Sequence, residues 1–235
     1  MNPDRRTSLA AGVLFIIATV AALAAAAIEP SRVAVMDLAQ VAANHDRYAV
    51  AALFYLVAAG TSVGIAAVLY PVLRPVNGAA ALGSVVFRTI EAVFYTVAVV
   101  ALLSILRLAT APAGDPALSS ALTGALGSLR DHASLAGVFA FCTGALLYYG
   151  LFFQARLLPR WLSGWGIVAA LLMLTACVLA VFQDEGITGY VALILPIAIQ
   201  EMVLAVWLVA KGFSQPRVVA SEVPGIALSE SPAGA

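Results

Sequence analysis

Charge is scarce in this chain. Charged residues make up 10% of its 235 residues, whereas a typical soluble domain carries about 25%. Hydrophobic residues make up 63%, and the mean hydropathy is +1.03. The 12 basic residues balance the 12 acidic ones, so the net charge does not indicate a nucleic-acid partner. This composition excludes an ordinary soluble protein.

Cysteine and histidine are rarer still. The two cysteines, Cys142 and Cys177, lie in apolar stretches without a CxxC or metal-type spacing, which favours packed side chains. The two histidines belong to no HExxH motif or Ser/His/Asp arrangement, and no glycine-rich phosphate loop is present. We therefore predict a non-enzymatic protein with no catalytic residues and no cofactor. An enzyme acting on lipid is the weakest alternative.

Long apolar runs dominate the sequence instead. A helix needs about 20 mainly apolar residues to cross the hydrocarbon of a bilayer. Six runs qualify, at residues 8–27, 49–69, 79–106, 135–153, 162–182 and 188–209. They lack the alternation of barrel strands, and the first is too long for the core of a signal peptide. The sequence therefore predicts an all-α membrane protein, a polytopic bundle of six transmembrane helices over residues 1–213.

The connections between the runs indicate an orientation. With the N-terminus in the cytoplasm, the inner segments hold seven basic residues and the outer segments four, as the positive-inside rule requires. We therefore expect both termini in the cytoplasm. Residues 214–235 are rich in Pro, Ser, Ala and Glu and have no periodic apolar face, which predicts a disordered cytoplasmic tail.

Two outer connections are longer than a turn requires. Residues 33–47 and 117–130 both carry apolar residues at helical spacing, with polar residues on the opposite face. Each segment can form a short interfacial helix on the outer leaflet, or it can extend the next crossing helix by a few turns. The sequence leaves these two alternatives open.

Full charges stand inside the third and sixth runs. Arg88 and Glu91 share one helix face with Tyr95, and Gln200 and Glu201 lie in the sixth run. At a rise of about 1.5 Å per residue, Arg88 and Glu201 both lie close to the bilayer midplane. An unpaired central charge costs about 2.5–3.5 kcal/mol or more, so these groups should face the bundle. Equal depth predicts an Arg88–Glu201 ion pair joining the third and sixth helices, while Glu91 leans on Arg88 or stays protonated.

This polar cluster of Arg88, Glu91, Tyr95, Gln200 and Glu201 has two interpretations. As a clasp, it fixes how two helices dock and binds nothing. As a polar or proton-handling site, with two further tyrosines (148 and 149) within reach, it makes the protein a small carrier or sensor. Both "EAVFYTV" (91–97) and "EMVLAVW" (201–207) begin with Glu-x-Val, on the last helix of halves that run in opposite directions. Inverted halves of this kind build many transporters.

Two peripheral groups carry weaker hypotheses. Outside the membrane, two histidines and two aspartates (His45, Asp46, Asp131 and His132) can be imagined as metal ligands, but aspartates favour helix starts and we predict no metal site. On the inner side, a tight turn is flanked by Arg156, Arg160, Trp161 and Trp165. Tryptophans at a membrane border are interface anchors, and contact with an anionic lipid headgroup is the alternative. The expected partners are membrane lipids, with a second copy of the chain as another candidate and the ligand unknown.

Several stretches together resemble one family. They are "RRTSLAAGVLFIIATVAAL", "YPVLRPVNGAAALGSVVFRTIEAV", "LPRWLSGWGIVAALLML" and "IQEMVLAVWLVAKGF". From about Arg5 to Phe213 the chain resembles the bacterial multi-spanning membrane proteins catalogued as domain-of-unknown-function family 4386. The R-x-x-E and P-R-W-L-S-G-W-G pieces are the specific parts. The resemblance implies an integral protein of the bacterial cytoplasmic (inner) membrane and carries no activity with it.

Overall fold

The computed structural model describes residues 3–28, 38–111, 115–183 and 187–214. Its helices are α1 (Pro3–Ile28), α2 (Leu38–Ala43), α3 (His45–Leu73), α4 (Gly78–Ala109), α5 (Pro116–Ala155), α6 (Arg160–Gln183), the 3-10 turn η2 (Ile187–Tyr190) and α7 (Val191–Ala210). Six of them are long and apolar enough to cross a membrane, which confirms the predicted all-α bundle. The last predicted run begins in η2 rather than in α7 itself.

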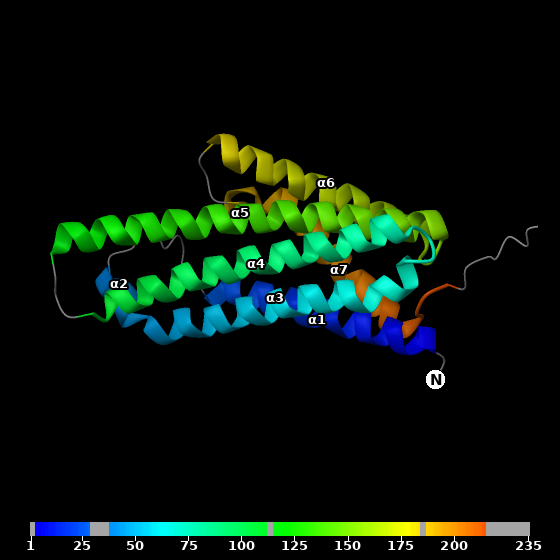
Figure 1. Ribbon diagram of the computed structural model, residues 1–235, viewed down its shortest axis with the longest axis horizontal. Coiled ribbons are helices and arrows are strands. Elements are labelled where there is room, and N and C mark those ends of the chain that lie inside the picture. Colours follow the sequence, from blue (N-terminus) through cyan, green and yellow to red (C-terminus); the bar gives the residue numbers. More distant parts are fainter. Residues whose placement is uncertain (1–2, 29–37, 112–114, 184–186, 215–235) are drawn as a thin grey trace, which may run out of the picture.

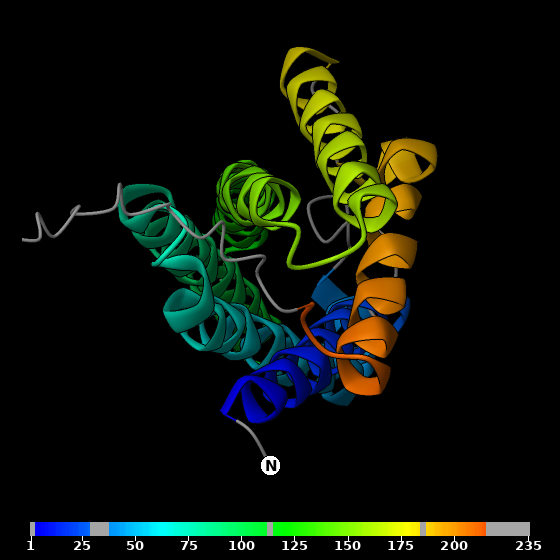
Figure 2. The same cartoon turned by 90° about the vertical axis from the view of Figure 1, so that its right-hand side faces the viewer.

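The six long helices form a closed ring. Each packs against the next long helix along the chain, and α7 returns to pack against α1. Figure 2 shows this circular order from one end of the bundle. We name that end the N-terminal end (Figure 1). It holds the start of the chain, the α3–α4 and α5–α6 connections, and the end of α7. The opposite end is named the far end.

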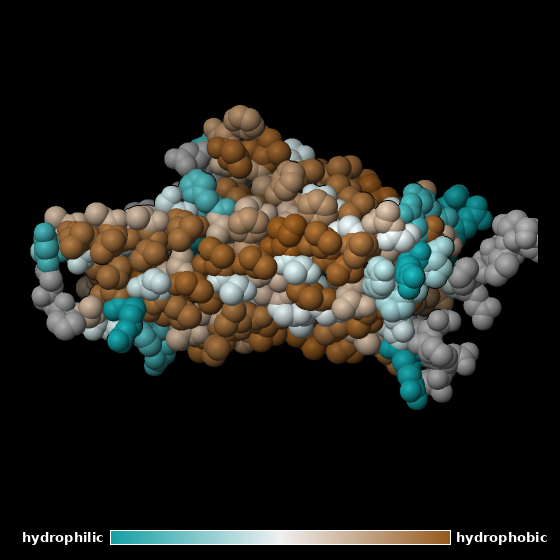
Figure 3. All heavy atoms as spheres, viewed as in Figure 1, coloured by the Kyte–Doolittle hydropathy of each residue, from teal (hydrophilic) through white to brown (hydrophobic). Residues whose placement is uncertain are grey.

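The outer surface of the ring is apolar along most of its length. In Figure 3, hydrophobic residues cover the middle of the molecule and hydrophilic residues gather toward its two ends. Large apolar side chains face outward on several helices, among them Val93, Val181 and Leu195, each more than half exposed. A soluble monomer rarely exposes a continuous apolar surface of this size. The surface therefore fits immersion in the hydrocarbon of a bilayer.

The two long outer connections take different forms. The short helix α2 stands alone before α3 and buries Val41, while residues 33–37 lie outside the described residues. Residues 117–130 instead continue into the 40-residue α5, which projects beyond the other helices at the far end (Figure 1). The side chain of Asp115 accepts a hydrogen bond from the Ala117 amide at the start of α5. Leu126 then packs on the far end of α4, which favours continuing the helix.

The predicted tail, residues 214–235, lies outside the described residues apart from Ser214. Just before it, the chain start and the end of α7 are joined. The Arg5 guanidinium donates to the carbonyl oxygens of Leu208 (3.1 Å) and Val209 (2.6 Å). These carbonyls lie in the last turn of α7, where no further helical amide can reach them. Arg5 therefore closes the ring at the N-terminal end.

Small residues set the closest helix approaches. A methyl group on Gly144 of α5 would lie 3.3 Å from the side-chain carbons of Arg88 on α4. Of the Gly60/Gly64 pair on α3, Gly64 meets Leu14 of α1, whereas Gly60 has no neighbouring atom within 4 Å. Because Gly144 has no side chain, α5 approaches α4 closely, and the Arg88 side chain packs against α5 at this position.

Candidate functional site

Polar side chains from several helices face the interior of the ring near the middle of its length. They come from α1 (Thr19), α3 (Ser62), α4 (Arg88, Glu91, Tyr95), α5 (Tyr148, Tyr149) and α7 (Gln200, Glu201). Hydrogen bonds link α1 to α7, α3 to α4 and α5 to α7 within this set. We name these nine residues the interior cluster. It contains every residue of the predicted polar cluster and adds others.

Arg88 and Glu91 form the charged centre of the interior cluster. Arg88 Nη1 lies 3.0 Å from Glu91 Oε2, and the two side chains are only 3% and 4% exposed. Their spacing of three residues places them on one face of α4, so the helix itself brings the charges together. The Ser62 hydroxyl donates to the same Glu91 oxygen at 2.7 Å. The ion pair therefore also binds α4 to α3.

The guanidinium of Arg88 also rests on α5. Its Cζ atom lies 4.8 Å from the centre of the Phe141 ring, the position of a cation–π contact. Gly144, one turn further along α5, leaves room for the aliphatic part of the side chain. Arg88 thus contacts α5 through an aromatic face and a glycine, and the charged group is almost fully enclosed by protein.

Glu201 takes a different partner from the one predicted. Its Oε2 accepts a hydrogen bond from the Thr19 hydroxyl of α1 at 3.2 Å. The predicted ion pair between Arg88 and Glu201 is wrong, because Arg88 pairs with Glu91 on its own helix. Equal depth in the membrane does not fix lateral distance, and α4 and α7 are not neighbours in the ring.

Gln200 is fully buried, and both its side-chain oxygen and its side-chain nitrogen form hydrogen bonds. The Tyr149 hydroxyl donates to its Oε1 at 2.5 Å, and its Nε2 donates to the Leu162 carbonyl of α6 at 3.2 Å. Gly166 of α6 makes room for the Tyr149 ring, since a methyl group there would lie 2.6 Å from ring carbons. Gln200 therefore ties α5, α6 and α7 together.

Tyr95 lies on the same face of α4 as Arg88 and Glu91. It is half-buried, and its ring packs against Gly137 of α5, where an added methyl group would approach ring carbons to 2.9 Å. Its position one turn beyond Glu91 matches the predicted face.

Three side chains of the interior cluster have polar atoms that find no hydrogen-bond partner. They are Arg88 Nε, Tyr148 Oη and Glu201 Oε1, each inaccessible from outside. Arg88 Nη1 meets Glu91 as an ion pair but without an aligned hydrogen bond. Nearly all buried polar atoms in proteins have a partner, so unpaired ones call for an explanation. The guanidinium atom can only donate, the carboxylate oxygen can accept, and the phenol can do either.

Sequence reasoning missed Thr19, Ser62 and Phe141. Most hydroxyls in these helices donate to the carbonyl four residues earlier on the same helix, as Thr89, Thr96 and Thr143 do. Thr19 and Ser62 donate across to another helix instead, and no sequence motif separates the two kinds. Only the position of a residue on an inward helix face distinguishes them.

The peripheral groups occupy both ends of the bundle. At the N-terminal end, Trp161 stacks on Trp165 with ring centres 6.5 Å apart and meets Trp207 of α7 edge-on at 6.3 Å. Arg160 lies over the Phe153 ring at 5.3 Å, and Arg156 ends α5 in a left-handed conformation (φ 53°). Both arginines are exposed.

The histidines at the far end have local partners. His45 Nδ1 lies 3.2 Å from the neighbouring Asp46 carboxylate, and His132 Nδ1 lies 2.7 Å from the Ser128 carbonyl oxygen. Within the described parts of the chain, no three or more His, Cys, Asp or Glu side chains gather as metal ligands. His45 and His132 therefore belong to no such group.

Comparison with known proteins identifies the chain only at the level of its family. A comparison with curated proteins and a comparison with solved structures each find no match. One family model matches residues 10–212, which is most of the chain and includes the whole interior cluster. The resemblance suggested by the R-x-x-E stretch of α4 is thereby confirmed. The chain belongs to the family described as Domain of unknown function (DUF4386).

Proposed function

We propose that this integral membrane protein is a small carrier or sensor whose interior cluster binds a proton, or a small cation, in the middle of the membrane. The observation that carries the proposal is the buried Oε1 atom of Glu201, which has no hydrogen-bond partner. A group whose only task is to hold helices together gains nothing from unpaired atoms, each of which costs about 1–3 kcal/mol when buried. A binding site keeps such atoms for its guest.

The charge balance indicates the kind of guest. One guanidinium faces two carboxylates, so the interior cluster carries one formal negative charge when both are ionised. Glu91 already has Arg88 and Ser62 as partners. Glu201 has one neutral hydroxyl, and its Oε1 is free to accept. Glu201 is therefore the group on which a proton or small cation would neutralise the cluster.

Part of the interior cluster still serves as a clasp between helices. The Arg88–Glu91 pair with Ser62 and Phe141 connects α4 to both of its neighbours, α3 and α5. This connection is a structural role for Arg88 and Glu91, and it differs from the predicted link between the third and sixth helices. We propose that the two roles are divided, with Arg88–Glu91 holding the helices and Glu201 binding the guest.

The proposed setting is the bacterial cytoplasmic membrane, with the N-terminal end of the bundle inside the cell. Support comes from the basic residues Arg5, Arg6, Arg74, Arg156, Arg160 and Lys211, which belong to that end. We propose that the protein has no enzymatic activity.

Infrared difference spectroscopy tests the proton site. The purified protein in lipid nanodiscs is moved between mildly acidic and mildly alkaline buffer, and the carbonyl band of protonated carboxyl groups is recorded. We expect a band change that disappears in Glu201→Gln and persists in Glu91→Gln and in the exposed control Asp46→Asn. A spectrum unchanged by Glu201→Gln, with correctly folded protein, would refute the assignment. Repeating the measurement at constant pH with added sodium or potassium distinguishes a cation from a proton.

A further inference from the structure

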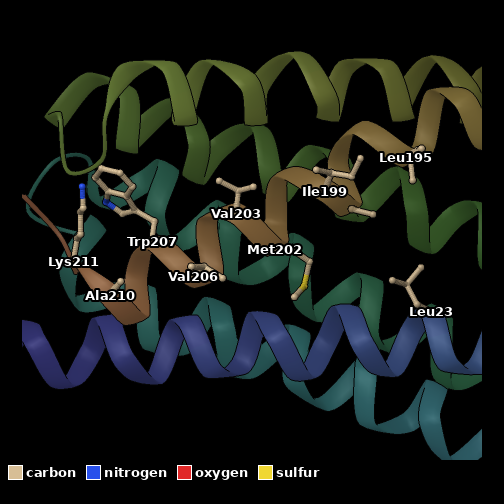
Figure 4. A pocket seen from close by; sticks show the side chains of 10 residues that line it. Leu23, Leu195, Ile199, Met202, Val203, Val206, Trp207, Ala210 and Lys211 are labelled. Atoms are coloured by element: carbon tan, nitrogen blue, oxygen red, sulfur yellow. The ribbon is translucent and has the colours of Figure 1, made fainter.

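A long apolar groove runs along the outside of α7, away from the interior cluster. Its volume is about 600 Å³, and its walls are apolar side chains of α7 with Leu23 of α1. Leu195, Ile199, Met202 and Val206 repeat at helical spacing along its floor. Figure 4 shows these side chains in one row, with Leu195 and Leu23 at one end and Trp207 and Lys211 at the other.

The two ends of the groove differ in polarity. Lys211 is the one charged residue among those lining the groove, and it lies at the N-terminal end of the bundle. Its Nζ atom lies 4.3 Å from the centre of the Trp207 ring, and the residue is exposed. Trp207 in turn packs against Trp161, which follows the exposed Arg160. A cationic, aromatic border therefore adjoins the mouth of an otherwise apolar groove.

From this asymmetry we propose that the groove binds one anionic phospholipid, with an acyl chain along α7 and the headgroup phosphate at Lys211. The distance from Leu195 to Lys211 is about 24 Å along the helix, which exceeds the ~15 Å hydrocarbon depth of one leaflet. A single acyl chain entering at the N-terminal end fits within that length. The positive charge stands where a lipid headgroup lies, and basic residues at this depth attract anionic lipids.

A second copy of the chain fits the groove less well. A partner helix packed along α7 would lie about 8–10 Å from it and would cover the groove together with Lys211 at its end. A partner helix would also need an acidic residue opposite Lys211 and an apolar face elsewhere. A phospholipid has this polarity by its nature.

Native mass spectrometry tests the lipid site. The full chain is exchanged into micelles that contain equal amounts of phosphatidylglycerol and phosphatidylcholine with identical acyl chains, and the lipids retained by each protein are counted. We expect one phosphatidylglycerol to be retained in preference to phosphatidylcholine. Lys211→Gln should lower that preference about fivefold, the contribution of one cation near an anionic lipid. The matched control is Arg6→Gln, which removes an exposed positive charge at the same end and should leave the preference unchanged.

A second pair of variants tests the groove itself. Val206→Trp fills the groove and should abolish retention of both lipids, whereas Val86→Trp on the exposed face of α4 should not. Equal retention of both lipids by the unchanged protein would overturn the proposal. So would a loss of preference in Arg6→Gln as large as in Lys211→Gln, or a lipid-free dimer in which Val206→Trp breaks the association. If Lys211→Gln does not fold, Lys211→Arg should retain the preference and Val206→Trp remains decisive.

Discussion

Arg88 and Glu91 form a buried ion pair within one helix, with Arg88 Nη1 3.0 Å from Glu91 Oε2. The pair is joined to α3 through Ser62 and to α5 through Phe141, so one short segment of α4 connects three helices. Removing either charge leaves the other buried without compensation. The stability of the bundle should therefore depend on the pair as a unit.

A double-mutant cycle on Arg88 and Glu91 should show strong coupling. We expect Arg88→Leu or Glu91→Leu alone to lower the free energy of unfolding by about 3–5 kcal/mol, and the double variant to recover much of that loss. Unfolding in detergent micelles, followed by circular dichroism, measures it. The matched cycle of Arg88→Leu with Glu201→Leu should recover much less. Equal recovery in the two cycles would contradict the assignment of Glu91 as the principal counter-ion.

Ser62 should matter far more than its neighbour on α3. The Ser62 hydroxyl donates to a buried charged oxygen, and such bonds contribute about 1.5–3 kcal/mol. Thr61 donates to the Val57 and Ala58 carbonyls of its own helix and is half-buried. We expect Ser62→Ala to lower the unfolding free energy by that amount and Thr61→Ala to change it by less than about 0.5 kcal/mol. Similar effects for the two would show that the Ser62–Glu91 bond contributes little.

Two glycines should respond to alanine in opposite directions. A methyl group on Gly166 would lie 2.6 Å from ring carbons of Tyr149, which holds Gln200. We expect Gly166→Ala to destabilise the protein by about 1–3 kcal/mol through overpacking. Gly60 has open space around it, so Gly60→Ala should stabilise α3 by about 0.5–1 kcal/mol. Melting temperatures of the two variants in one detergent decide the matter, and a stable Gly166→Ala protein would contradict this packing.

The orientation prediction can be checked with reporter fusions. Fusions at Asn77 and Pro159, at the N-terminal end, should report a cytoplasmic position, and fusions at Asn44 and Asp115, at the far end, an external one. Alkaline phosphatase and a fluorescent protein, active on opposite sides of the membrane, give the two signals. External activity at Asn77 together with cytoplasmic signal at Asp115 would reverse the proposed orientation.

The sequence predicts the crossings well and the far-end geometry poorly. Each crossing is encoded by its own apolar run, so no knowledge of neighbours is needed to find it. The conformation of residues 117–130 depends on the neighbouring helix, because Leu126 can pack on α4 only where α4 extends as far as Leu126. A segment with one apolar face satisfies both an interfacial helix and an extended crossing, so its pattern does not discriminate between them.

The sequence indicates which residues form the candidate site but not which of them contact one another. Arg88, Glu91, Gln200 and Glu201 stand out because charged and amide groups are rare in apolar runs. Their partners depend on the order of helices around the ring, and depth along the membrane normal carries no information about that order. Thr19 is an example, since it reaches Glu201 only because α1 and α7 are adjacent.

The placement of the Arg88 counter-ion on α4 has a consequence for biosynthesis. Helices enter the bilayer in the order in which the ribosome delivers them, and α7 is delivered last. A guanidinium that relied on Glu201 would wait in hydrocarbon while three further helices were inserted, at a cost of several kcal/mol. Glu91 emerges three residues after Arg88, so α4 can enter the membrane as an almost neutral segment. Glu201 is delivered with α7, the last helix, so the insertion of α4 does not depend on it.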